Sequence, residues 1–471
     1  MPLLFIGVPL AAVLALNLAY KWINEKLALY TAAAVSLFQI GVSAVCIDLS
    51  LRGGTIYSLR FIEKLSIDTV SAVVLFTIGL TVFVSLIVSN ATLKSGTFNF
   101  INMLLMITIG MNGLAMVTDL FSLYVFIEAT SAASFVLIGI NRGRDELEGA
   151  FKYYLMSAIA TVLMMTSVAL FFYYAGDTSF IGVSSFIAGL NGNYPYGLLT
   201  AFILYTAGLL IKSGVVPFHS WVLDTYSPAP APVSVLLAGI VTKVSGVYAV
   251  IRITRNVFLN NAAVCNVLIS LGLLSVIMGA LAAIGQKDMK RMLAYSSISQ
   301  IGYIMLGIGS GSALGLAGAL FHFFNHSTFK SLLFVDTAAI EMQTGTRDMD
   351  KMGGLAQKMP VTGISSLLAF LSTAGIPPLS GFWSKLLIIV ALWKVSAPVA
   401  VTALAAGILT LSYFLIMQKK VFFGKVPETL ENVREAGGGI LGAEILLSVI
   451  NVAAGILFPL ALIYMNSIGK I

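Results

Sequence analysis

Several titratable side chains of this 471-residue chain stand inside long apolar stretches. Glu128 has apolar neighbours on both sides. Three lysines, Lys212, Lys243 and Lys385, are equally deep in apolar sequence. A lysine at the centre of a membrane helix costs roughly 2.5–3.5 kcal/mol on insertion scales, so such residues are usually functional. Amines and carboxyl groups bind and release protons, which indicates proton transfer inside a membrane.

Glu128 and Lys212 are expected to be partners, because a buried carboxylate should find a cation. An acid about 4 Å from a lysine contributes roughly 4 kcal/mol at an effective dielectric of about 20. Moving the acid away would release the proton from the lysine, and its return would favour reloading. The alternative is a structural carboxyl group that is only hydrogen-bonded.

His322, His326 and Lys330 are spaced at i, i+4 and i+8, which places them along one face of a helix. Histidine titrates near neutral pH, so this row could relay protons. The alternative is a pair of structural histidines that bind a neighbouring helix. A zinc site is disfavoured, because this His-x-x-x-His has no Glu inside it and no third ligand is evident. His219 fits a loop or hinge contact better than a relay.

Other charged residues of the apolar stretches have simpler interpretations. Lys152 and Lys330 could lie near enough to a helix end for their amines to reach the interface. A further set of acids near helix ends fits interfacial or capping roles. These acids are Asp48, Asp68, Asp119, Asp224, Asp336 and Glu444.

The amino-acid composition indicates the class of protein that contains these titratable residues. Hydrophobic residues make up 58% of the chain and charged residues 10%, against about 25% charged in soluble domains, which excludes a soluble enzyme. Continuous apolar runs favour helices over the alternating strands of a membrane barrel. Two cysteines, Cys46 and Cys265, are too few for an iron–sulfur cluster or a cysteine zinc site. No cofactor or metal is therefore expected.

Fourteen apolar windows predict an all-α, polytopic membrane protein, at about 20 residues for each span of a bilayer. The windows are 2–20, 27–47, 66–90, 100–118, 119–140, 149–175, 197–223, 228–251, 263–284, 291–309, 312–338, 361–393, 398–421 and 440–465. The division between 100–118 and 119–140 is the weakest, because almost no loop separates them.

The loop charges predict the orientation. If both termini lie outside, fifteen basic residues fall in inside loops and seven in outside loops, as the positive-inside rule expects. The inside set is Lys21, Lys26, Lys94, Arg142, Arg144, Lys287, Lys290, Arg291, Arg347, Lys351, Lys358, Lys419, Lys420, Lys425 and Arg434. The outside set is Arg52, Arg60, Lys64, Arg252, Arg255, Lys394 and Lys470.

Two windows, five helices apart, are interrupted by proline in a Gly-x-x-Pro pattern, at 214–217 and at 375–378. Residues 151–155 and 329–333 also match as Phe-Lys-x-x-Leu. An odd offset implies inverted copies, and inverted repeats with broken helices are typical of transporters. The alternative is two unrelated proline kinks. The repeat predicts N-terminal helices over 1–99, a first repeat over 100–255, a second repeat over 256–425 and a last helix over 426–471.

Three segments, 212–252, 288–298 and 375–382, resemble motifs of the antiporter-like subunits of respiratory complex I, Mrp-type antiporters and membrane-bound hydrogenases. The resemblance covers roughly residues 100–420. It implies fourteen helices with inverted five-helix repeats. Its site roles are an acid–lysine pair at Glu128 and Lys212, a connecting lysine at Lys243, a central row at His322, His326 and Lys330, and the terminal exit residue at Lys385. Lysine at that last position resembles the Mrp antiporter's D component, the antiporter-like component of the hydrogenase or the complex I subunits that bear lysine there; some other branches have glutamate.

The leading hypothesis is a proton-translocating subunit of a larger membrane complex in a prokaryotic plasma membrane. Its expected partners are other membrane subunits, the lipid bilayer and protons, with a neighbouring subunit as the route for any sodium and no nucleic acid involved. It would have no redox chemistry of its own. The alternatives are a self-sufficient secondary cation/proton carrier, an integral membrane enzyme and a scaffold that has lost activity.

Overall fold

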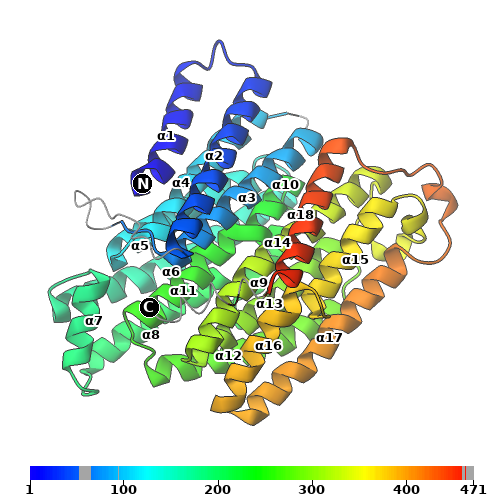
Figure 1. The fold of residues 1–471 in the computed structure, drawn as a ribbon. Coiled ribbons are helices and arrows are strands. Elements are labelled where there is room, and N and C mark those ends of the chain that lie inside the picture. Colours follow the sequence, from blue (N-terminus) through cyan, green and yellow to red (C-terminus); the bar gives the residue numbers. More distant parts are fainter. Residues whose placement is uncertain (52–64, 94, 459–461, 463–471) are drawn as a thin grey trace. The chain divides into compact units, whose positions relative to one another are not determined.

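The computed structural model describes residues 1–51, 65–93, 95–458 and 462, and this part of the chain is helical (Figure 1). The helices of the N-terminal part are α1 (Pro2–Leu18), α2 (Glu25–Leu51), α3 (Thr69–Thr92), α4 (Thr97–Met116), α5 (Leu120–Ile138), α6 (Arg144–Ala175), α7 (Phe180–Gly189), α8 (Tyr196–Ser213) and α9 (Ser220–Tyr226). Next come α10 (Ala231–Leu236), the π-helical turns η1 (Leu237–Val241) and η2 (Lys243–Tyr248), and α11 (Ala249–Asn256).

The C-terminal part contains α12 (Ala262–Ile284), α13 (Met289–Gly309), α14 (Ala313–Thr344), α15 (Pro360–Ala374), α16 (Ser380–Val395), α17 (Ala397–Val421) and α18 (Gly438–Ile456). Short 3-10 turns form η3 (Met349–Lys351), η4 (Leu355–Gln357) and η5 (Glu428–Leu430). Each of the fourteen predicted windows coincides with helix. Helix α7 was not predicted; its first turn is capped by the Ser179 hydroxyl at the amide of Gly182.

Within the described residues, ten helices are long and apolar enough to cross a membrane. The all-helical, multi-pass prediction is therefore confirmed, whereas the count of fourteen spans is not. Many large apolar side chains point outward, such as Ile203 on α8 and Ile408 on α17. A soluble protein rarely exposes such surfaces, but lipid solvates them. Five basic residues used to predict the orientation lie outside the described residues, namely Arg52, Arg60, Lys64, Lys94 and Lys470. The end of the last predicted window also lies outside them.

The weakest predicted division is present. Helix α4 ends at Met116, Val117 is extended, and α5 begins at Leu120. The Asp119 side chain accepts a hydrogen bond from the amide of Ser122 at 2.8 Å, which satisfies one of the free donors of the first turn. This capping role of Asp119 agrees with the sequence prediction.

Both predicted helix breaks are also present. Gly214, with φ of 68°, caps the C-terminus of α8, and Gly375, with φ of 85°, caps that of α15. Glycine is the residue that adopts this left-handed conformation without a steric cost. The Val216–Pro217 and Pro377–Pro378 bonds that follow are cis. The helices resume at Ser220 and Ser380.

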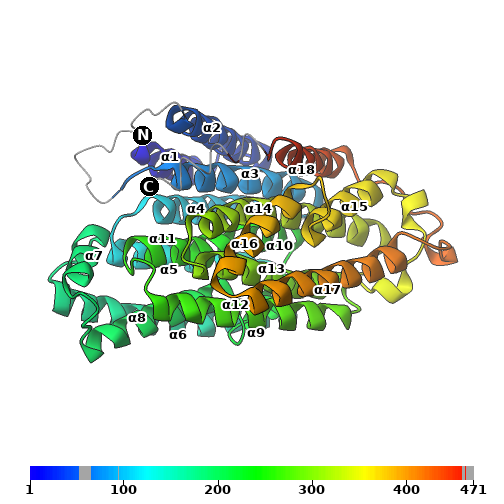
Figure 2. The same cartoon turned by 60° about the horizontal axis from the view of Figure 1, so that its bottom comes forward.

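The chain packs as two compact units. The first contains residues 1–83, 96–225 and 240–268, and the second contains 84–95, 226–239 and 269–471. In the first unit α4 lies against α1 and α5, and α6 lies against α8. Figure 2 shows α6 and α8 side by side. The domain limits and the inverted repeat that the sequence suggested remain predictions.

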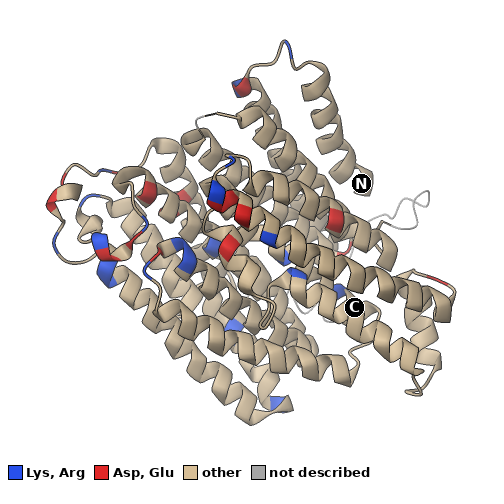
Figure 3. Ribbon diagram, turned by 180° about the vertical axis from the view of Figure 1, so that it is seen from behind, with Lys and Arg blue, Asp and Glu red and all other residues tan. Residues whose placement is uncertain are grey.

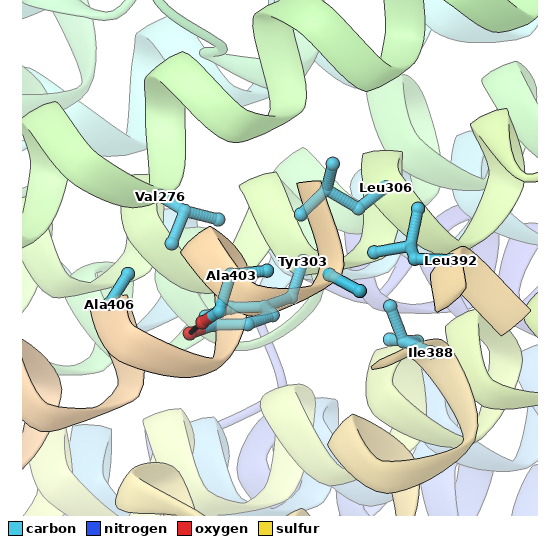
Figure 4. Packing of buried hydrophobic residues seen from close by; sticks show 8 residues of the cluster. Val276, Tyr303, Leu306, Ile388, Leu392, Ala403 and Ala406 are labelled. Atoms are coloured by element: carbon cyan, nitrogen blue, oxygen red, sulfur yellow. Dashed lines mark hydrogen bonds between the residues drawn. The ribbon is translucent and has the colours of Figure 1, made fainter. Parts of the chain in front are cut away.

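In the second unit α14 lies among α13, α15, α16 and α18. Figure 4 shows an apolar cluster in which Val276 and Tyr303 meet Ile388 of α16 and the small residues Ala403 and Ala406 of α17. Small residues let membrane helices approach closely, where packing rather than exclusion of water holds them together. The cluster fixes the helices that carry Tyr303 and Lys385.

Candidate functional site

Lys212 lies in the last turn of α8 and is enclosed by the first unit. Its Nζ donates to Glu128 Oε1 at 2.9 Å, to Ser131 Oγ at 2.9 Å and to Ser157 Oγ at 2.5 Å. Glu128 and Ser131 belong to α5, and Ser157 belongs to α6. The expected contact between Glu128 and Lys212 is therefore confirmed.

The three partners match the three N–H donors of an ammonium group. The lysine side chain is 1% exposed, whereas that of Glu128 is 30% exposed. Removing one partner of an enclosed ion pair leaves a costly unpaired charge. The arrangement therefore stabilises a protonated lysine for as long as the more accessible acid stays beside it.

The broken backbone after α8 is tied to the helices around Lys212. Trp221 Nε1 donates to the Ile211 carbonyl oxygen at 3.0 Å. Its ring stacks on Tyr153 of α6, with centroids 4.4 Å apart and planes 7° apart. A hydrogen bond and a stacked ring together fix the position of the last turn of α8.

Lys243 has a different environment in the same unit. It begins η2, is fully buried, and its Nζ has no hydrogen-bond partner in the part of the chain that the structure describes. Ser245 of this turn bonds back to the carbonyl oxygen of Val241. This amine can accept a proton or a new hydrogen bond without breaking an existing one.

The predicted central row lies on α14 in the second unit. His322 Nδ1 is 2.9 Å from Ser384 Oγ, and its ring centroid is 6.2 Å from that of His326. Lys330 is fully buried, bonds Ser296 Oγ, and donates to the Leu293 carbonyl oxygen at 3.2 Å. The suggestion that the Lys330 amine reaches the interface is therefore wrong.

Lys385 is held at the second helix break. Its Nζ donates to the Thr373 carbonyl oxygen at 2.7 Å, one residue before the end of α15. It also lies 4.5 Å from the centre of the Tyr303 ring. The last turn of α15 carries the partial negative charge of a helix C-terminus, and although Leu371 and Ser372 already accept backbone amides, the Thr373 carbonyl group accepts the amine. Ser384, the preceding residue, is the partner of His322, so α16 presents both positions.

Most of the helical ribbon carries no charge, and charged residues concentrate near loops and at a few places within helices (Figure 3). Lys152 is one of the charged residues to which the sequence analysis gave an interfacial interpretation. Its side chain is 42% exposed and pairs with Glu148 at 2.7 Å and Asp224 at 2.9 Å. This fits the interfacial interpretation. His219 lies in the loop between α8 and α9, as expected.

The prediction for two acids is wrong. Asp336 is 2% exposed and Glu444 is fully buried, within α14 and α18 of the second unit. Neither caps a helix or lies at an interface. The available signal was their position several residues inside apolar helices, the same signal that identified Lys385. Among the described residues, no group of three or more His, Cys, Asp and Glu could hold a metal ion.

Comparison with known proteins adds independent information. Residues 117–410 match the family described as NADH:quinone oxidoreductase/Mrp antiporter, TM. The chain belongs to this family. It is thus a multi-pass, antiporter-like membrane protein, as the resemblance implied.

The matched relatives include the D component of the Na(+)/H(+) antiporter of Alkalihalophilus pseudofirmus, 32% identical over 70% of this chain and 67% of that protein. The N component of the NADH-quinone oxidoreductase of Desulforudis audaxviator is 34% identical over 70% of this chain and 66% of that protein. A chain of the Mrp complex from Dietzia sp. shares the fold with a TM-score of 0.91 and 23% identity, covering 100% of this chain and 97% of that one.

Proposed function

We propose that this family member moves protons across the membrane as one subunit of a multisubunit assembly of the Mrp or complex I type. The observation that carries the proposal is the enclosed Lys212 ammonium group with its partly exposed acid partner. The family match and the names of the relatives support the assembly.

In the first unit, Lys212 is proposed to hold the proton and Glu128 to control its release. Two opposite charges 2.9 Å apart attract by about 6 kcal/mol at an effective dielectric of about 20. Withdrawal of the acid removes this energy and frees the proton. Lys243, which has no hydrogen bond to lose within the described residues, is the proposed acceptor that connects onward.

In the second unit, the proposed carriers are His322, His326 and Lys330, with Lys385 as the terminal donor at the exit. A neutral imidazole has one donor and one acceptor nitrogen, so adjacent histidines can pass a proton along. His322 touches Ser384 of α16, beside Lys385. This contact supports transfer between α14 and α16.

We further propose that the protein lies in the plasma membrane of a prokaryote with both termini on the outer side. The excess of basic residues in the loops assigned to the inside supports this orientation. Cysteines introduced singly at Asn193 and Lys358, in loops predicted to face opposite sides, would test it with an impermeant thiol reagent. Labelling of both from one side would contradict it.

The transport role is tested with Lys212→Met and Glu128→Gln in vesicles that contain the whole native assembly. Both variants should assemble but reduce the proton gradient strongly. Lys152→Met is the matched control, because that lysine is also paired with acids of this unit but is exposed. Unchanged pumping in Lys212→Met and Glu128→Gln would contradict the assigned roles.

Purification distinguishes the assembly from a carrier that works alone. After gentle solubilisation, the native protein should migrate with other membrane subunits. The purified chain alone in liposomes should not exchange protons for sodium or potassium. Efficient exchange by the single chain would instead support the self-sufficient carrier.

A further inference from the structure

Three carboxyl groups of the second unit come together away from the proposed carriers. Asp336 of α14 and Glu444 of α18 are buried and in direct side-chain contact. Glu435, in the loop before α18, is only partly buried. Thr362, in the first turn of α15, joins them, since its Oγ1 is 3.1 Å from Glu435 Oε2 and 3.1 Å from Glu444 Oε1.

The hydrogen atoms available here are too few for three ionised acids. The Val361 amide donates to Glu435 Oε1 at 2.5 Å, and Ser365 Oγ donates to Asp336 Oδ1 at 2.6 Å. The Thr362 hydroxyl has one hydrogen but faces oxygens of both glutamates. Asp336 Oδ2 is buried and receives no hydrogen bond from any described residue.

Within the described residues, neither Asp336 nor Glu444 forms an ion pair with a basic side chain. On the helices packed against the pair, Lys290 of α13 is paired with Glu341 at 3.2 Å, and Lys330 of α14 bonds Ser296 and Leu293. Lys385 of α16 binds Thr373. Two carboxylates in contact without a cation repel each other, whereas one added proton turns the contact into a hydrogen bond. The arrangement is therefore satisfied only when the pair holds a proton.

We propose that Asp336 and Glu444 share a proton, and that Glu435 and Thr362 load this site from the loop side to supply Lys330. The hydroxyl of Thr362 accepts a proton from Glu435 and gives its own proton to Glu444, so the threonine is unchanged. Asp336 lies six residues beyond Lys330 on α14, about 9 Å along the helix axis. The supply of Lys330 rests on the proposed function, but the shared proton does not.

The shared proton is tested by infrared difference spectroscopy of the full chain in lipid. The wild-type protein should show the carbonyl stretching band of a protonated carboxyl group at neutral pH. Asp336→Asn and Glu444→Gln should each shift or abolish that band. Asp350→Asn, which changes an acid in η3, should leave it in place. A wild-type spectrum without the band, or a band unchanged in both pair variants, would overturn the proposal.

The loading route is tested by proton uptake in vesicles with the whole assembly. Thr362→Val removes the hydroxyl at nearly constant volume and should slow uptake by about a hundredfold, the lower end of the contribution of a positioned proton-transfer group. Thr362→Ser restores the hydroxyl and should keep the rate. Equal rates for both variants would refute the route. Lys212→Met, measured alongside, reports separately on the proposed function, since its failure would leave the infrared result unaffected.

Discussion

The ammonium group of Lys385 lies 4.5 Å from the centre of the Tyr303 ring while it donates to the Thr373 carbonyl oxygen at 2.7 Å. The ring is itself fixed, because the Tyr303 hydroxyl donates to the Ala403 carbonyl oxygen at 2.8 Å. Helices α13, α15 and α17 thus determine where a charge carried by α16 is held. A movement of α16 against them would alter the stability of that charge.

Substitution of Tyr303 should separate the ring from its hydroxyl. Tyr303→Phe keeps the aromatic face and should retain proton transport, while losing about 1 kcal/mol of stability with the hydrogen bond. Tyr303→Leu removes the face, a contribution of about 0.5–2 kcal/mol, and should slow transport severalfold. Rates in vesicles, normalised to the amount of assembly, measure the difference. Equal rates for the two variants would show that the ring does not act on Lys385.

Ser131 and Ser157 should be needed to hold the proton on Lys212. Each alanine substitution leaves one N–H of the enclosed ammonium group without an acceptor, at about 1–3 kcal/mol. We expect Ser131→Ala and Ser157→Ala to slow transport by about tenfold at unchanged assembly. The control is Ser134→Ala, because that hydroxyl bonds the Thr130 carbonyl oxygen of its own helix. A comparable loss in Ser134→Ala would indicate a packing effect.

The sequence predicted those features that depend on a residue type in a context where it is rare, because such a residue has few physical explanations. A lysine in an apolar membrane helix is energetically costly, so we expected it to be buried and functional. An acid in another apolar stretch was its expected partner. A Gly-x-x-Pro pattern had to end a helix, because proline lacks a donor and glycine tolerates positive φ. These arguments found Glu128, Lys212 and both breaks without any tertiary information.

The sequence does not predict the features of the site that depend on tertiary contacts. Nothing local marks Tyr303 as the ring beneath Lys385, since its partner is eighty-two residues away along the chain. The π-helical turns around Lys243 have no composition that distinguishes them from an α-helix. Asp336 and Glu444 looked like ordinary terminal acids because each stands near an end of its predicted window, and only packing of α14 against α18 reveals their contact.

The pair of Asp68 and Arg252 in the first unit should make stability depend on acid pH. Two bonds of 2.5 and 2.6 Å join the carboxylate to the guanidinium group. Burial alone would raise the pKa of Asp68, but the charge and hydrogen bonds of Arg252, with those of Ser71, lower this pKa from 3.8 to about 2. The folded state therefore binds this proton less readily than the unfolded state.

Because the pKa of Asp68 is lower in the folded state, its ionised form stabilises that state. This stabilisation is present above pH 3.8 and is lost as the pH falls towards 2. Because the carboxyl is 32% exposed, we expect about 1–2 kcal/mol. Asp68→Asn should lower the melting temperature near pH 6 but flatten its fall between pH 4 and about 2. Asp145→Asn, an exposed acid at the start of α6, should keep the wild-type slope. An unchanged slope in Asp68→Asn would contradict the assignment.

Gly375 should be required at the second break because of its positive φ and because it lies close to the Lys385 side chain. Its φ of 85° strains any residue with a Cβ, and an added Cβ would lie 3.2 Å from Lys385 Cδ. Gly375→Ala should cost about 1–2 kcal/mol from the left-handed backbone alone, and should also slow transport by displacing the lysine. Gly41→Ala is the matched control, since a Cβ on that α2 residue meets no atom within 4 Å and alanine favours helix by about 1 kcal/mol. Thermal unfolding of the purified assembly should therefore move in opposite directions for the two variants, and a shift of the same sign would show that the break does not depend on glycine.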